Sequence, residues 1–259
     1  MKKKAYLILF FLWPISASIV SFLINANFFV STILFLGVPS VFLSFLNRKN
    51  IKKLAVFSLI FAIPISVVMD YIMEATGGWH VPYSILGSFR LFNFVTLDLV
   101  LWSILEAYLI LMFYETFLEK QCTPKLYHPN LKYLFVIFYI ALGVFVLLYM
   151  FNPTILQINF FYLKMGITLA LLPVAGTLLK FPKFWNKFLN IAAYFFIFNF
   201  IYEVTAVKLG QWSFPAEHQL IGIVQFMGAR FALEELLFWM ILTAMSVVAF
   251  YEIFDDDQR

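Results

Sequence analysis

The chain has 259 residues, of which 63% are hydrophobic and 12% are charged, and its mean hydropathy is +0.92. Soluble domains are only about half apolar, so this composition excludes a soluble globular protein and indicates a polytopic membrane protein in a lipid bilayer. The single cysteine, Cys122, excludes an internal disulfide and a multi-cysteine metal site, and three histidines are too few for His-rich redox iron sites. The net charge of +4 comes from short basic segments, which favours membrane orientation over nucleic-acid binding.

Eight segments reach the roughly 20 apolar residues that a membrane-spanning helix needs. The predicted spans are residues 5–24, 28–46, 54–73, 91–113, 131–151, 157–179, 188–207 and 227–250. The first of them also fits a cleaved signal peptide, because three lysines precede its apolar part and small residues end it. The other seven spans keep the same topology in either case.

Basic residues gather on one side of this arrangement. That side carries Lys2, Lys3, Lys4, Arg48, Lys49, Lys52, Lys53, Lys120, Lys125, Lys132, Lys180, Lys183 and Lys187. The opposite side carries only Arg90, Lys208 and Arg230. By the positive-inside rule we expect a multi-pass protein of the cell membrane with both termini in the cytoplasm.

Two stretches of the chain, residues 70–117 and 203–254, share one pattern. The matching positions are Asp70, Gly77, Trp79 and Pro82 with Glu203, Gly210, Trp212 and Pro215, and, after a four-residue gap, Trp102, Ala107, Tyr114, Glu115 and Phe117 with Trp239, Ala244, Tyr251, Glu252 and Phe254. Such a match predicts an internal duplication. We therefore expect an all-α membrane protein with two parallel repeats of the same orientation, residues 1–117 and 131–254, joined by a cytoplasmic linker (118–130) and followed by a tail (255–259).

Acidic side chains at membrane depth are the most informative feature, because each is costly unless it faces the bundle interior. The candidates for chemistry are Asp70, Asp98, Glu203, Glu234 and Glu235, which the predicted spans bring to one layer in the outer half of the membrane, Asp98 and the Glu234/Glu235 pair about 10 Å deep. Asp98, Trp102 and Glu106 share one helix face, and Glu235, Trp239 and Thr243 form the corresponding stripe. A buried carboxyl that stays protonated can act as a general acid, and aromatic faces can stabilise a carbocation.

Structural explanations compete with this chemistry. Glu234 can pair with Arg230 one turn earlier, and Lys164 can neutralise another acid. A tryptophan at the level of the lipid headgroups, as expected for Trp79 and Trp212, is typically an interfacial anchor. Glu115 and Glu252, at the cytoplasmic helix ends, are expected to be solvated.

The duplicated pattern resembles the small-subunit type of lycopene cyclase, which occurs as a heterodimer or as one fused chain in bacteria, archaea and fungi. Each copy of that domain has an acid or amide at a helix end, a Gly-x-Trp loop, a Leu-Gly pair, and a Pro-x-Glu-Glu motif that opens a helix ending in Tyr-Glu. The similarity covers residues 28–117 and 157–254. FLGVPSVFLSFLNRKNIKKLAVFSLIFAIPISVVMDY resembles the first helix pair, and IGIVQFMGARFALEELLFW the acidic motif of the second copy.

The acidic motif departs from the family pattern in both copies. The first copy reads Thr96-Leu97-Asp98-Leu99 and the second reads Ala232-Leu233-Glu234-Glu235, so both prolines and one acid are absent. Asp98 corresponds to Glu234 by the register of the motif and to Glu235 by the spacing to the downstream tryptophan.

The resemblance implies an intramolecular cyclase, an isomerase of carotenoid biosynthesis. It would protonate an end of an acyclic carotenoid or other isoprenoid, without a metal or another cofactor, and carotenoid-pathway enzymes are possible partners. Glu234 or Glu235 is then the general acid, with Asp98, Asp70 and Glu203 as partner acids; the expected substrate-binding residues are Trp79, Trp102, Glu106, Trp212 and Trp239. A non-catalytic isoprenoid-binding protein of the same fold and a proton-coupled transporter are the alternatives.

Overall fold

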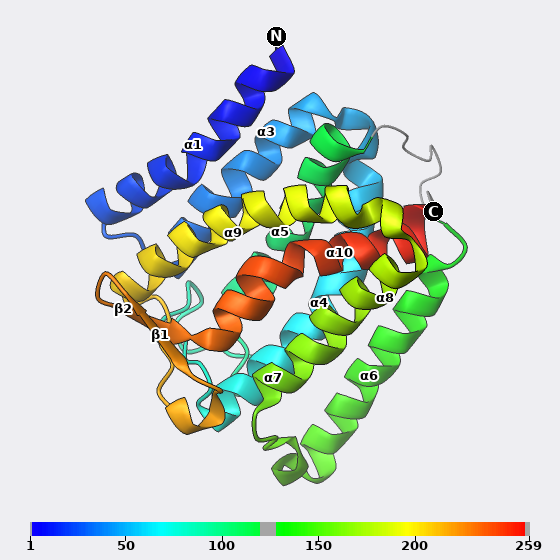
Figure 1. The fold of residues 1–259 in the computed structure, drawn as a ribbon. Coiled ribbons are helices and arrows are strands. Elements are labelled where there is room, and N and C mark those ends of the chain that lie inside the picture. The colour runs from blue at the N-terminus through cyan, green and yellow to red at the C-terminus, as the bar shows by residue number, and fades with distance from the viewer. Residues whose placement is uncertain (1, 120–127, 257–259) are drawn as a thin grey trace.

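The computed structural model describes residues 2–119 and 128–256, which form a bundle of long helices with one small β-hairpin (Figure 1). Eight helical segments of the described residues are long and apolar enough to cross a membrane, as the sequence predicts. They are Ala5–Leu23, Phe28–Leu46, Arg48–Thr76, Leu97–Leu118, Leu131–Phe151, Phe161–Lys180, Pro182–Lys208 and Glu235–Asp255. The all-α membrane class is thereby confirmed.

Several spans are composed of consecutive helical segments of different geometry. In the first half of the chain the elements are α1 (Lys2–Leu23), α2 (Phe28–Thr32), η1 (Ile33–Gly37), α3 (Val38–Leu46), η2 (Arg48–Asn50), α4 (Ile51–Thr76), α5 (Leu97–Phe113) and η3 (Tyr114–Leu118). In the second half they are α6 (Leu131–Phe151), η4 (Pro153–Leu156), α7 (Phe161–Met165), η5 (Gly166–Leu171), α8 (Leu172–Lys180), η6 (Pro182–Phe184), α9 (Trp185–Lys208), η7 (Glu217–Gln219), β1 (Ile223–Phe226), β2 (Ala229–Ala232), η8 (Glu235–Leu242), α10 (Thr243–Tyr251) and η9 (Glu252–Asp256). In Figure 1, α1 and α6 lie at opposite edges, with α5 and α10 in the interior.

Two spans begin later than the predicted boundaries of 91 and 227. Residues 91–95 form a short bridge between Leu91 and Val95, and residues 223–232 form the antiparallel hairpin β1–β2. Asp98 consequently lies in the first turn of α5, one residue after its start, and not about 10 Å from the helix end as the predicted boundary implied. An acid in this first turn is stabilised by the positive end of the helix dipole.

Two prolines inside the membrane follow widened, π-helical turns. Pro39 is the second residue after the end of η1, and Pro173 is the second residue after the end of η5. Because proline has no N–H, carbonyl groups in the preceding turn lose their helical partner. The indole of Trp13 donates to the carbonyl of Leu34 at 2.9 Å, and Ser246 donates to that of Leu169. Neighbouring helices thus satisfy freed carbonyls, as membrane helices require.

Glu115 and Glu252 are buried, and the expectation that they are solvated is wrong. The Tyr251 hydroxyl donates to Glu115 at 2.7 Å, and the Tyr114 hydroxyl donates to Glu252. The helix ends of one half of the chain therefore complete the hydrogen bonding of the other half. The sequence could not reveal this exchange, because it depends on how η3 and η9 meet in space.

Part of the predicted linker and tail lies outside the described residues. This applies to Lys120, Cys122 and Lys125 and to residues 257–259. Asp255, the first residue of the predicted tail, belongs instead to η9, where its side chain is buried.

Candidate functional site

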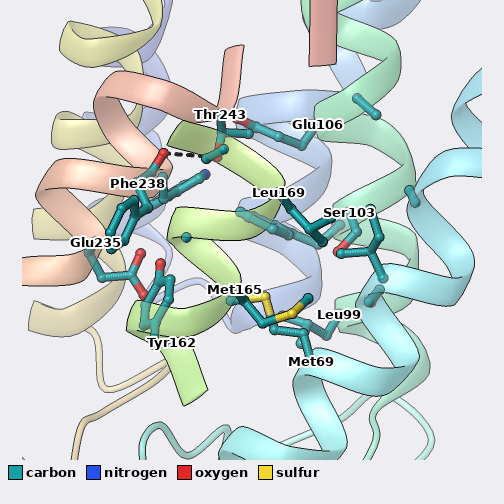
Figure 2. Close-up of a pocket in the computed structure, with 18 of the residues that line it drawn as sticks. Met69, Leu99, Ser103, Glu106, Tyr162, Met165, Leu169, Glu235, Phe238 and Thr243 are labelled. Atoms are coloured by element: carbon teal, nitrogen blue, oxygen red, sulfur yellow. Dashed lines mark hydrogen bonds between the residues drawn. The ribbon is translucent and has the colours of Figure 1, made fainter. Parts of the chain in front are cut away.

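A cavity of about 200 Å³ lies inside the bundle, bordered by α4, α5, α7, η5, α9, η8 and α10 (Figure 2). Its walls are mostly apolar, and it is open to the outside of the protein, not sealed. Three carboxyl side chains border it, Glu106, Glu203 and Glu235, each no more than 7% exposed. All four tryptophans that were predicted to bind substrate, Trp79, Trp102, Trp212 and Trp239, border it as well.

The two tryptophan loops meet over one end of the cavity. His80 and Ser213 exchange two backbone hydrogen bonds, of 2.8 and 3.0 Å, in an antiparallel bridge. Since alternate side chains of extended chain point to the same side, Trp79 and Val81 from one loop and Trp212 and Phe214 from the other line the cavity together. The loops form a roof to which both halves of the chain contribute.

Each roof tryptophan also binds a buried acid of its own half. The Trp79 indole N–H donates to Asp70 at 3.1 Å, and the Trp212 indole N–H donates to Glu203 at 3.0 Å, both across nine residues. Trp212 is only 9% exposed. Both indoles therefore hold carboxyl groups, which is a more specific task than anchoring at the membrane interface.

Asp70 and Glu203 differ in what their second oxygen does. The other oxygen of Asp70 accepts from the backbone N–H of Thr96 at 3.1 Å, so both of its oxygens are bonded and the side chain does not border the cavity. The longer Glu203 reaches the cavity, and its Oε1 is buried without a hydrogen-bond partner among the described residues. Only Glu203 of this pair is available to a ligand.

Asp98 and Glu234 form a second matched pair. Asp98 accepts from the N–H of Ile85 at 2.7 Å and Glu234 from the N–H of Ile221 at 2.8 Å, in both cases 13 residues earlier in the chain. Neither acid borders the cavity. Burial raises the pKa of Glu234, and the hydrogen bond from Ile221 acts in the opposite direction. Both acids thus fix their loops, and Asp98 corresponds to Glu234 by this contact.

The π-helical segment η8 explains why the spacing alone gave two answers. Trp102 lies four residues after Asp98, whereas Trp239 lies five after Glu234. A π-helical turn closes its hydrogen bonds over five residues where an α-helical turn closes them over four, so η8 accommodates one additional residue. With Asp98 at the position of Glu234, Leu99 takes the position of Glu235, and both of these border the cavity. The second half carries a cavity acid where the first half has leucine.

Tyr162 is a functional candidate that the sequence did not reveal. It lies in the first turn of α7, is 4% exposed and borders the cavity, and its hydroxyl faces the carboxyl of Glu235 (Figure 2). Its ring meets Trp79 edge to face at 5.6 Å. Tyr162 lies outside the two matched stretches, so the repeat pattern could not mark it.

Glu106 and Thr243 border the end of the cavity that lies away from Glu235 and Tyr162 (Figure 2). The side-chain amide of Asn199 donates to Glu106 Oε1 at 3.0 Å, while Glu106 Oε2 has no partner of good geometry among the described residues. Trp102 precedes Glu106 by one turn of α5, and the centroid of its ring lies 5.4 Å from that of Trp239. An aromatic wall thus connects Glu106 with the Glu203 and Glu235 side of the cavity.

The basic partners that the structural explanation required are engaged elsewhere or are absent from the cavity. Arg230 pairs with Glu217 at 2.8 Å. Lys164 is exposed and forms no ion pair with any residue in the described part of the chain. Holding a buried carboxyl as an anion without a cation is far more costly than holding it as a neutral acid. The three cavity carboxyls are therefore suited to carry protons.

An apolar layer separates the cavity from the Tyr–Glu contacts at the other helix ends. Glu106 and Glu115 are nine residues apart on one helical run, about 13 Å at the rise of an α-helix. Between them α5 contributes buried side chains such as Leu109, Ile110 and Phe113. The cavity carboxyls and the carboxyls of Glu115 and Glu252 thus lie in two separate regions of the bundle.

The cavity unites seven of the ten predicted site residues and leaves out Asp70, Asp98 and Glu234. Within residues 2–119 and 128–256, no group of three or more His, Cys, Asp or Glu side chains could hold a metal ion. Comparisons with protein-family models, with curated proteins and with solved structures find no match for this chain.

Proposed function

We propose that this protein is an integral-membrane, lycopene cyclase-like enzyme that closes a ring at the end of an acyclic carotenoid or related isoprenoid by acid catalysis. The observation that carries the proposal is the cavity itself, where Glu203 and Glu235 face an apolar, tryptophan-lined space without a basic partner among the described residues. The substrate class is a hydrocarbon that is dissolved in the bilayer.

The chemistry needs one proton and returns one. A protonated carboxyl adds its proton to the terminal double bond of the substrate and leaves a tertiary cation on the neighbouring carbon. A second double bond of the same chain attacks this cation, so that a carbon–carbon bond closes the six-membered ring and the positive charge moves to another ring carbon. Loss of a proton from the carbon next to that charge restores a double bond, and the substrate and product have the same composition.

Glu235 is our choice for the general acid, and the carboxylate that it leaves takes the proton back, with Glu203 as the neighbouring partner acid that can exchange a proton with it. Both line the cavity, and they lie close enough for their charges to interact. Glu203 is oriented by Trp212 and has one oxygen without a hydrogen-bond partner in the described part of the chain, whereas Glu235 faces the hydroxyl of Tyr162. The faces of Trp102 and Trp239 can stabilise the intermediate cation.

We also propose that the two halves arose by duplication and share one orientation in the cell membrane, with both termini in the cytoplasm. Matched contacts in the two halves support the duplication. The bond from Trp79 to Asp70 corresponds to that from Trp212 to Glu203, and the backbone bond to Asp98 corresponds to that to Glu234. The positive-inside distribution of lysine and arginine supports the orientation.

The decisive test is production of cyclic carotenoids in cells that accumulate lycopene. We expect the wild type to give a cyclic product, and Glu235→Gln to lower the rate by about 10²–10⁴-fold, the usual contribution of a general acid. Glu203→Gln should give a loss of similar size. Glu217→Gln, on an exposed loop, is the control and should match the wild type.

The neighbouring acid separates catalysis from folding. Glu234→Gln changes a carboxyl that binds the loop at Ile221, so its effect should be much smaller than that of Glu235→Gln at equal protein level. A wild-type protein that is present in the membrane but leaves lycopene unchanged would remove the cyclase proposal for that substrate. A non-catalytic isoprenoid-binding protein would then be favoured if the pigment still copurified.

A further inference from the structure

The volume of the cavity limits how much of a substrate can enter it. A cavity of 150 Å³ in another protein holds one benzene molecule, so about 200 Å³ holds a single six-membered ring with a few methyl groups. A complete carotenoid is several times larger. If the proposed function is right, only one end of the substrate enters, and the rest of the chain must leave through an opening.

The roof and the inner end leave little room for that opening. The roof is closed by the backbone bridge between His80 and Ser213, and the inner end by the buried apolar layer around Ile110 and Phe113. The side between α4 and α7 differs from both. There Ile65 and Met69 of α4 and Met165 of α7 border the cavity and are partly exposed.

Figure 2 shows Met69 and Met165 with their side chains turned toward each other across the space between these two helices. Methionine is unbranched and flexible, so a pair of methionines can move aside without a change in the backbone. On the same helical run, Ile167 and Leu171 are 37% and 43% exposed and do not border the cavity, which shows that this run also faces the surroundings of the bundle.

We infer that the ligand is a long apolar chain that enters sideways from the bilayer, between α4 and α7, through a gate formed by Met69 and Met165. One end group fills the cavity, and the remainder of the chain stays among the lipids. Two consequences follow: the protein accepts acyclic isoprenoids of different length as long as their ends are alike, and it acts on one end at a time. The identity of the ligand rests on the proposed function, whereas the entry route does not require catalysis.

Binding can be followed without any turnover. Four of the six tryptophans border the cavity, so energy transfer from tryptophan to a bound polyene reports occupancy. The probe is phytofluene, an acyclic carotenoid, added to the full chain in lipid nanodiscs. Myrcene, a short acyclic isoprenoid, should compete with phytofluene because both would place the same kind of end group in the cavity. Absence of competition at saturating myrcene would overturn the single-end arrangement.

The gate is tested with Met165→Cys in a Cys122→Ser background, modified with benzyl methanethiosulfonate. We expect the modified protein to bind phytofluene at least about tenfold more weakly and to recover when a reducing agent removes the benzyl group. Ile167→Cys in the same background is the matched control, since its side chain is on the same helical run but outside the cavity. Its modification should leave binding unchanged.

Three further results would overturn the inference: no energy transfer with the wild type, undiminished binding after modification at position 165, or a thiol at position 165 that resists modification while that at 167 reacts. Failure of the cyclase proposal looks different. In that case phytofluene binds and the modification blocks it, but cells that accumulate lycopene form no cyclic product. Lateral entry would then hold for a protein that binds isoprenoids without converting them.

Discussion

Gly166, the first residue of η5, lies directly against the ring of Phe238, which borders the cavity. A Cβ atom added at position 166 would be 2.2 Å from two carbons of that ring, whereas carbon atoms in contact are separated by roughly 3.5–4.0 Å. In Gly166→Ala the ring must therefore move by more than an ångström, and the open direction is the cavity. Overpacking of this kind costs about 1–3 kcal/mol.

Thermal unfolding of the purified protein in detergent measures this cost. For a chain of this size we expect a lower melting temperature by roughly 2–4 °C for each kcal/mol. Gly176→Ala, in the same membrane span, is the control, because a Cβ atom there meets nothing within 4 Å. It should be neutral or slightly stabilising, by up to about 1 kcal/mol. If the two variants unfold at the same temperature, the close contact between Gly166 and Phe238 does not exist.

Three further outcomes are expected. Trp212→Phe keeps an aromatic ring but leaves Glu203 without its donor, which should cost about 1–3 kcal/mol of stability in a chemical unfolding titration; an unchanged midpoint would mean that the bond contributes nothing. Asn199→Leu should cost a similar amount by removing the donor to Glu106, and Asn199→Gln should restore little because its amide is displaced by one carbon; full stability of the leucine variant would contradict the contact. Burial raises the pKa of Glu234, so folding takes up a proton at this carboxyl. The stability of the wild type relative to Glu234→Gln should therefore fall as the pH rises above about 4.5. A difference in melting temperature between the two proteins that stays constant from pH 4 to 8 would refute this.

The eight spans could be predicted from the sequence because a run of about 20 apolar residues is enough to identify a membrane-spanning helix. The sequence placed two starts too early, since the apolar residues of the β1–β2 hairpin and of the bridge at Leu91 look like helix by composition. It also indicated the cavity carboxyls, because acids among apolar residues are rare unless they face an interior. The cavity tryptophans were indicated by the pattern that the two stretches share.

What the sequence could not supply were contacts between distant segments. The hydrogen bond from Tyr114 to Glu252 joins residues 138 positions apart, so nothing local distinguishes this glutamate from a solvated one. The extra residue in η8 is visible only as an ambiguous spacing until the loop contacts fix Asp98 against Glu234. Tyr162 was missed for a third reason: it has no counterpart in the repeat pattern.

The crossed bonds between η3 and η9 and their neighbouring helix ends also affect how the protein can assemble. Neither residues 1–117 nor residues 131–254 contain both members of a Tyr–Glu pair, because Tyr251 serves Glu115 and Tyr114 serves Glu252. A half-length polypeptide on its own would lack the tyrosine hydroxyl that donates to its buried glutamate, and the opposite half would supply that hydroxyl. Two such polypeptides made separately would thus have a chemical reason to pair in the bilayer, and because Tyr114 matches Tyr251 and Glu115 matches Glu252, two copies of one half could form the same crossed bonds.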